Sequence, residues 1–229
     1  MKKLKITSLL SALILVVSTT MSPVLAGSFG LGASIQAGAV DLRGNETLAS
    51  NSIVTGAEEV AGFGSAAGYV QYMFGETGFV VGYEKTPGKV ELGDKTNTVK
   101  STCGTNCTGS SFVTNTAKAH LSGHNAIYIE SPAFGGLFVK AAYNNVTLIT
   151  EESLGTGSTY GNLDINGTTI GAGFRGTSES GLHMKITGEM TNYDTINLNG
   201  VSSDGSGTEN KIKVDADTYA VKFSLGYNF

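Results

Sequence analysis

The chain has 229 residues, of which 15 are basic and 19 acidic, giving a formal net charge of −4; 32 residues are glycine and none is tryptophan. A nucleic-acid-binding protein would normally be basic, so that class is disfavoured. Beyond the N-terminal region no apolar run approaches the roughly 20 residues of a transmembrane helix.

The N-terminal segment predicts a secretory signal peptide. Three lysines within the first five residues precede an apolar run at 9–17, and Val24 and Ala26 form a small-residue cleavage site. A membrane anchor is the alternative, but the run is shorter than a span of about 20 residues. We expect residues 1–26 to be removed and 27–229 to form one domain, with 12 basic and 19 acidic residues, or 12 − 19 = −7.

The rest of the chain alternates apolar and polar residues with a period of two, which is typical of β-strands. No segment shows a convincing helical period. The alternation predicts eight strands, of which the second is the least clear: 28–40, 68–74, 78–84, 118–130, 136–145, 168–175, 181–191 and 218–229.

The connections between these segments alternate in length. Short connections fall at 75–77, 131–135 and 176–181, and long polar ones at 44–59, 94–113, 151–161 and 195–211. We therefore expect four long loops at one end of the sheet and three short turns at the other. Both ends of the mature chain would lie at the short-turn end.

Both cysteines, Cys103 and Cys107, lie in the second long connection. An even number of cysteines in a secreted chain indicates a disulfide, here one that closes a very small loop. A metal site would need two more ligands, and no other cysteine or histidine lies near in sequence. We expect a disulfide there, and neither a metal nor a cofactor.

The two faces of the strands differ sharply. One collects nearly all the large aliphatic residues. A soluble sandwich also alternates, but a closed barrel is the sheet that satisfies its backbone in lipid, with its apolar face outward. Eight strands leave an interior just wide enough for side chains, and buried charges need partners. The other face carries the charged residues, and we expect a largely filled lumen in which these charges pair. They are Glu84, Lys118, Glu130, Lys140, Arg175, Lys185, Glu189 and Lys222.

The last predicted strand has a wholly apolar or aromatic face that runs from Tyr219 to Phe229. Ten residues of strand span about 33 Å. At a tilt of about 40° this projects to roughly 25 Å, the height of the apolar band of an outer-membrane barrel. The spacing of these two aromatic residues therefore suits the two membrane interfaces.

The signal peptide, the eight amphipathic strands, the alternating connections and the closing aromatic strand together resemble the small eight-stranded outer-membrane β-barrel proteins of Gram-negative bacteria, of the OmpA-barrel or opacity-protein type. The resemblance implies an all-β, closed, antiparallel up-and-down barrel in the cell outer membrane, with extracellular long loops and periplasmic termini. It implies contact with outer-membrane lipid and lipopolysaccharide. It also implies recognition by the barrel assembly machinery through the alternate residues Phe223, Leu225, Tyr227 and Phe229.

The stretch "HLSGH" is the strongest candidate for catalysis. His120 and Ser122 share a strand face at about 6–7 Å, as a base and a nucleophile could, and the spacing resembles that of outer-membrane lipid A deacylases. However, their parity places them in the lumen, away from lipid, and a third, orienting group is lacking. His124 lies about 13 Å from His120, too far for a shared metal ion. We expect polar lumen residues and no enzymatic activity.

These patterns predict a structural or surface-interaction role, carried by the four loops, whose ligand the sequence does not identify. Two alternatives remain open. One is a narrow channel for ions or small solutes, and the other is a lipid-modifying enzyme that uses His120 and Ser122.

Overall fold

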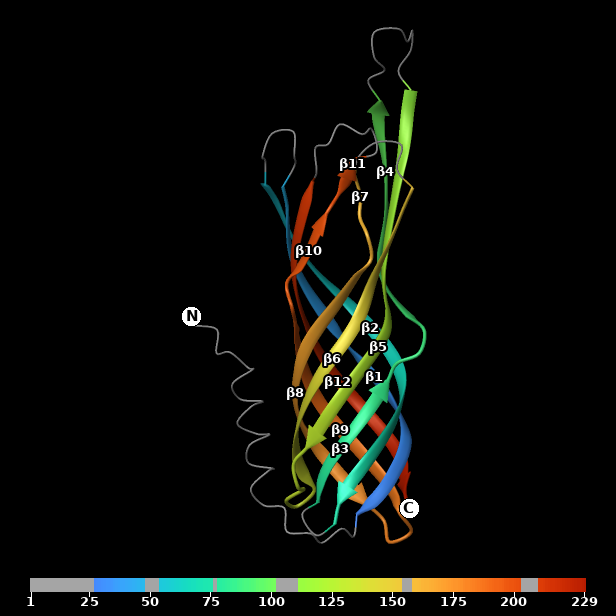
Figure 1. Ribbon diagram of the computed structural model, residues 1–229, viewed down its shortest axis with the longest axis vertical. Helices are drawn as coiled ribbons and strands as arrows, with labels where there is room; N and C mark the ends of the chain where they lie inside the picture. Colours follow the sequence, from blue (N-terminus) through green and yellow to red (C-terminus); the bar gives the residue numbers. More distant parts are fainter. Residues whose placement is uncertain (1–26, 48–53, 76–77, 102–110, 154–157, 203–209) are drawn as a thin grey trace.

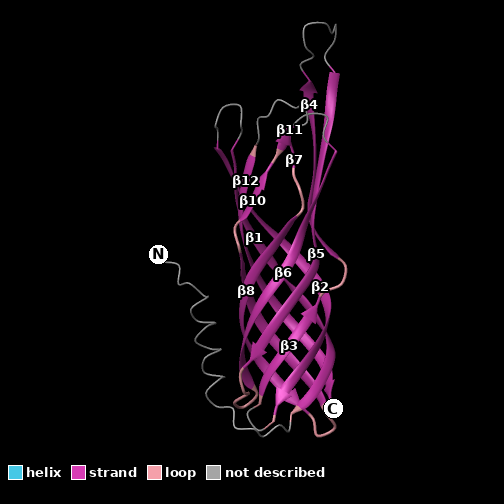
Figure 2. Ribbon diagram, in the orientation of Figure 1, coloured by secondary structure: helices cyan, strands magenta, loops and turns pink. Residues whose placement is uncertain are grey.

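The structure is a computed structural model that describes residues 27–47, 54–75, 78–101, 111–153, 158–202 and 210–229. The expected signal peptide, Cys103 and Cys107 lie outside these residues. The described residues form strands and short connections (Figure 2). Within them, no helix is long and apolar enough to cross a bilayer.

The described strands are β1 (Ser28–Thr47), β2 (Val54–Phe74), β3 (Phe79–Lys85), β4 (Lys89–Ser101), β5 (Ser111–Glu130), β6 (Leu137–Ser153), β7 (Ser158–Thr159), β8 (Leu163–Thr177), β9 (Leu182–Tyr193), β10 (Ile196–Asn199), β11 (Val201–Ser202) and β12 (Lys211–Asn228). Eight of them pair in the order β1-β2-β3-β5-β6-β8-β9-β12, and β12 pairs back with β1. The chain is a closed antiparallel eight-stranded barrel (Figure 1), as the sequence predicts.

The ring closes between the first and the last strand over a long, unbroken register. The β1–β12 ladder runs from Gly30↔Asn228 to Thr47↔Lys211. At its end the Phe229 amide donates a hydrogen bond of 2.7 Å to the Phe29 carbonyl. This continuity leaves no open sheet edge at the seam, where an unpaired backbone would be costly in lipid.

The alternation seen in the sequence becomes the two faces of the wall. On β12, Tyr219, Val221 and Phe223 are exposed on the outside, whereas Lys222 and Ser224 are buried inside. The exposed large apolar residues of the other strands continue this outer band: Leu31, Ile35, Val70, Val81, Tyr83, Ile127, Val139, Tyr143, Ile170, Phe174, Met184 and Ile186. The outer surface is therefore apolar, and the interior behind this part of β12 is polar, as in a membrane barrel.

The described parts of the segments expected as long loops are largely strand. β1 reaches Thr47, β2 begins at Val54, and β4 and β5 form a hairpin that projects beyond the rest of the barrel (Figure 1). Polar side chains contact one another across this hairpin. The hydroxyl oxygens of Thr98 and Thr114, for example, lie 3.3 Å apart. Apolar alternation marks only the part of a strand that faces lipid, whereas backbone pairing continues past it. We call this end the loop end and the opposite one the turn end.

Candidate functional site in the barrel lumen

Two tyrosine rings fill much of the lumen near the turn end. Tyr69 and Tyr128 are 4% and 3% exposed. A Cβ atom on Gly82 would collide with the ring of Tyr128, and one on Gly32 with the hydroxyl of Tyr69. The small residues on the inner face therefore make the space that these rings occupy.

Four charged side chains meet above these rings. Lys222 donates to Glu84 at 2.6 Å and lies 3.2 Å from Glu189, which also pairs with Lys140 at 2.7 Å. All four side chains are at most 8% exposed. Two ammonium groups and two carboxylates thus form a neutral chain of three ion pairs, and buried charges require such partners.

A second group of charges lies towards the turn end. Glu130 accepts from Arg175 at 2.9 Å and from Lys185 at 2.7 Å, and all three side chains are buried. Lys185 also donates to the amide oxygen of Gln71 at 2.8 Å, and Arg175 to the Gly78 carbonyl at 3.1 Å. Glu130 balances only one of the two positive charges, and neutral oxygens of Gln71 and Gly78 solvate the excess charge.

These two groups together form what we call the ion-pair layer: Glu84, Glu130, Lys140, Arg175, Lys185, Glu189 and Lys222. They are seven of the eight charged residues that the sequence assigns to the lumen. Next to the layer, the hydroxyl of Tyr69 lies 2.8 Å from His183 Nε2, which adds an uncharged contact at the turn end.

Lys118 does not belong to this layer. It is exposed, and in the register it lies between Asp94 of β4 and Glu151 of β6. The cause is a β-bulge in β5 between Ser122 and Asn125, where Gly123 has a φ of +67°. A bulge inserts one extra residue and so reverses which parity faces inward.

The same bulge changes the position of His120. Its neighbour Leu121 packs in the apolar interior with Val146, so His120 lies on the opposite side of β5. Its Nδ1 is 3.8 Å from a carboxylate oxygen of Glu151, while its Nε2 has no partner among the described residues. Placing His120 in the lumen by simple alternation was therefore wrong.

His120 and Ser122 are not joined by a hydrogen bond in the described part of the chain. Ser122 borders a cavity that His120 does not line. The structure thus does not bring the two residues together as a nucleophile and its base, an arrangement that requires hydrogen-bond reach.

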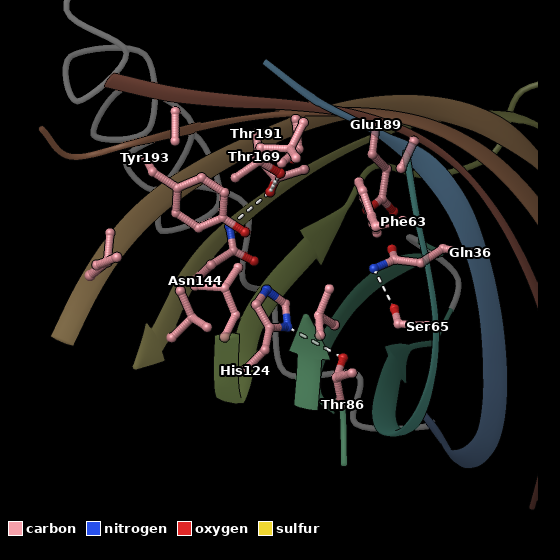
Figure 3. A pocket seen from close by; sticks show the side chains of 18 of the residues that line it. Gln36, Phe63, Ser65, Thr86, His124, Asn144, Thr169, Glu189, Thr191 and Tyr193 are labelled. Atoms are coloured by element: carbon pink, nitrogen blue, oxygen red, sulfur yellow. Dashed lines mark hydrogen bonds between the residues drawn. The ribbon is translucent and has the colours of Figure 1, made fainter. Parts of the chain in front are cut away.

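A cavity of about 110 Å³ lies on the loop-end side of the ion-pair layer, and we call it the upper chamber (Figure 3). Lys140, Glu189 and Lys222 form part of its floor. Its walls are largely apolar, with Val40, Leu42, Leu121, Val146, Ile165 and Ile196 among them. An engineered apolar cavity of about 150 Å³ stays dry and binds benzene, so this space suits a small apolar group.

The sequence carried a signal for this chamber that the strand assignment did not use. On β6, Tyr143 and Val139 face outward, but Val146 and Leu148 face inward and are 1% and 5% exposed. The apolar residues thus change parity beyond Asn144. Such a change shows where the lumen itself becomes apolar.

The wall beside the chamber is interrupted. The β2–β3 ladder ends at Gly68↔Lys85, and beyond it the described part of β2 pairs with β1 alone while β4 pairs with β5 alone. The chamber is lined from both sides of this gap, by Ala61 and Phe63 of β2 and by Val90 of β4. The interruption begins two residues beyond Tyr83, which is exposed on the outer face.

Comparisons with known proteins support the fold. No family model and no curated protein matches the chain. Among solved structures, the outer membrane protein OprG from Pseudomonas aeruginosa is similar with a TM-score of 0.55 and 13% identity, over 90% of this chain and 97% of that one. The outer membrane protein AlkL, determined in lipid bilayers, is similar with a TM-score of 0.52 and 8% identity, over 92% and 94%. The chain has the fold of the small outer-membrane β-barrels.

Proposed function

We propose that this chain is an outer-membrane barrel that does not conduct ions along its length and that receives small apolar molecules in its upper chamber. The observation that carries the proposal is the position of an apolar chamber directly on a layer of buried ion pairs, beside an interruption of the wall. A chamber closed below and bordered by apolar side chains favours entry of apolar molecules from the loop end or through the wall.

The ion-pair layer argues against a narrow channel. Its pairs lie at 2.6–3.2 Å, and the space among them is about 10 Å³. A cavity needs about 10–15 Å³ to hold one water molecule. A hydrated ion needs much more room, so passage would require several buried pairs to separate at once.

The wall interruption supports entry from the side. Backbone groups without partners are costly in the hydrocarbon region but tolerated at the water interface. The gap starts just beyond Tyr83, and tyrosines mark the interface in membrane barrels. An apolar molecule at the outer surface of the bilayer would therefore meet the chamber without crossing the ion-pair layer.

The proposal includes a location and an orientation. The loop end faces the cell exterior, both ends of the mature chain face the periplasm, and the outer band contacts outer-membrane lipid and lipopolysaccharide. The exposed alternate residues of β12, Phe223, Leu225, Tyr227 and Phe229, support recognition by the assembly machinery. No covalent step is proposed, and His120 and Ser122 have no catalytic role.

The projecting β4–β5 hairpin favours a second function, contact with a partner at the cell surface. Cells that carry a variant shortened by residues 96–114 are expected to lose contact-dependent aggregation while keeping toluene binding. Unchanged aggregation in this variant would contradict the surface role.

The test of the main proposal fills the chamber. Ala216 is buried and lines it, whereas Ala37 faces outward on β1, so Ala216→Phe and Ala37→Phe form a matched pair. Toluene binding to the refolded protein in detergent would be measured from methyl chemical shifts. We expect binding by the wild type and by Ala37→Phe, and its loss in Ala216→Phe. Equal binding by both variants would contradict the proposal.

A further inference from the structure

The polar groups of the upper chamber suggest what kind of molecule it holds. We propose that the ligand is a neutral amphipathic molecule, whose hydroxyl or carbonyl head binds Asn144, Tyr193 and His124 while its apolar body packs against Val146 and Ile165. This inference rests on the proposed function and specifies its substrate class.

The three polar residues form a row across four neighbouring strands. In the register Asn144 of β6 is opposite Gly167 of β8, and Gly167 is opposite Tyr193 of β9. A Cβ atom on Gly167 would lie 2.7 Å from the Tyr193 ring, so the ring lies across this glycine towards Asn144.

His124 completes the row from the other side. On β5, Ala126 is opposite Asn144, and His124 lies two residues further along the bulged strand. Figure 3 shows Tyr193, Asn144 and His124 one after another along the chamber wall. Three side chains from distant parts of the sequence thus point at one space.

Each of the three retains hydrogen-bonding capacity. The Asn144 amide donates to Thr169 Oγ1 at 2.8 Å, which leaves Asn144 Oδ1 as a free acceptor within the described structure. His124 Nδ1 lies 3.4 Å from Thr86 Oγ1, which leaves His124 Nε2 available for a hydrogen bond to a ligand. The Tyr193 hydroxyl has no hydrogen-bond partner among the described residues.

These groups are accessible from the chamber. Among the described residues, the side-chain atoms that are both sealed from solvent and unpartnered are His120 Nε2 and His183 Nδ1. The free atoms of Asn144, His124 and Tyr193 are therefore not sealed. Ligand sites are commonly apolar pockets with a few convergent polar groups of this kind, which fix the orientation of the ligand.

The charge of the head follows from the floor of the chamber. Lys140 and Lys222 are both paired with Glu189, and Lys222 also with Glu84. The other carboxylate that lines the chamber, Glu91, is exposed to solvent. No buried charge of the chamber among the described residues is therefore left to compensate a charged head, and burying an uncompensated charge is costly. A neutral head that donates and accepts hydrogen bonds fits instead.

The test compares toluene with benzyl alcohol, which share a ring and differ in a hydroxyl group. The protein is the full mature chain refolded in detergent, and each dissociation constant is divided by the wild-type value for the same ligand, which cancels partitioning into micelles. Tyr193→Phe and Asn144→Leu each remove part of the polar row. Tyr143→Phe is the matched control, because Tyr143 is exposed on the outer face.

We expect Tyr193→Phe and Asn144→Leu to weaken benzyl alcohol binding by about five- to tenfold, as the loss of one net hydrogen bond predicts, with toluene binding unchanged or tighter. Tyr143→Phe should change neither. If both ligands bind but Tyr193→Phe and Asn144→Leu behave like the control, the polar row has no role in binding and the inference fails while the proposed function stands. If neither ligand binds the wild type, both are overturned.

Discussion

The ammonium group of Lys222 lies 2.6 Å from a carboxylate oxygen of Glu84, although 138 residues separate them in the chain. One residue is on β12 and the other on β3, which are not neighbours in the ring. The pair therefore crosses the lumen and joins parts of the wall that no backbone ladder connects. The same ammonium group contacts Glu189 on β9, the strand next to β12.

Breaking this contact from one side should destabilise the barrel. Lys222→Met leaves Glu84 without its partner, and removal of one member of a buried ion pair costs about 3–5 kcal/mol. The free energy of unfolding would be measured by urea titration in lipid vesicles. The double variant Lys222→Met/Glu84→Gln should recover part of the loss, because the unpaired charge is gone.

Lys213 provides the control for this experiment. It lies on the same strand and is exposed, and a surface change away from specific contacts costs within about 0.5 kcal/mol. If Lys222→Met were no more destabilising than Lys213→Met, the ion-pair layer would have no structural role.

The packing of the tyrosine rings predicts an asymmetry between two glycines. Gly82→Ala places a Cβ against the Tyr128 ring, whereas around Gly68 no described atom lies within 4 Å of such a Cβ. Overpacking in a full interior costs about 1–3 kcal/mol. Gly82→Ala should lower the urea midpoint clearly, and Gly68→Ala should not. Equal urea midpoints for the two variants would show that the side chains around Tyr128 are not tightly packed.

The ion-pair layer predicts that the protein does not conduct ions in planar bilayers. The wild type should show no conductance steps in concentrated salt, because the space of about 10 Å³ among the buried ion pairs is no larger than one water molecule needs. Tyr69→Ala/Tyr128→Ala removes two rings from that region and should produce small steps. Regular steps from the wild type would instead support the narrow channel.

The position of His120 predicts that lipid chemistry does not depend on it. His120→Ala should leave the lipid A of expressing cells unchanged by mass spectrometry, because the residue is not hydrogen-bonded to Ser122. Since His120 is buried, heat-modifiable migration in SDS gels would confirm that the variant still folds. A lost lipid A modification in a folded variant would restore the enzyme hypothesis.

The proposed orientation is testable by labelling. With both natural cysteines replaced by serine, Thr98→Cys at the loop end should react in intact cells with a reagent that does not cross the membrane. Ser178→Cys at the turn end should react only after lysis, although both positions are exposed. The opposite pattern would invert the barrel.

The sequence by itself determined the barrel and most of its interior. Alternation with a period of two places Lys140, Lys185 and Lys222 on the inner face, because each strand has two faces and one of them must be apolar to meet lipid. Residue spacing also anticipated the outer aromatic residues of β12. These features are local, and local patterns are visible without knowing which strands are neighbours.

Only the tertiary structure decided the features that depend on strand register, on the β-bulge in β5 and on the end of the β2–β3 ladder. The bulge at Gly123 reverses the faces of β5 beyond it, which removes Lys118 from the lumen and separates His120 from it. The upper chamber exists because inward apolar residues of several strands come to the same height, next to the point where β2 and β3 stop pairing. Alternation within one strand carries no information about such alignment between strands. The physical reason is that one extra residue in a strand hardly alters its composition but exchanges its inward and outward faces beyond that point.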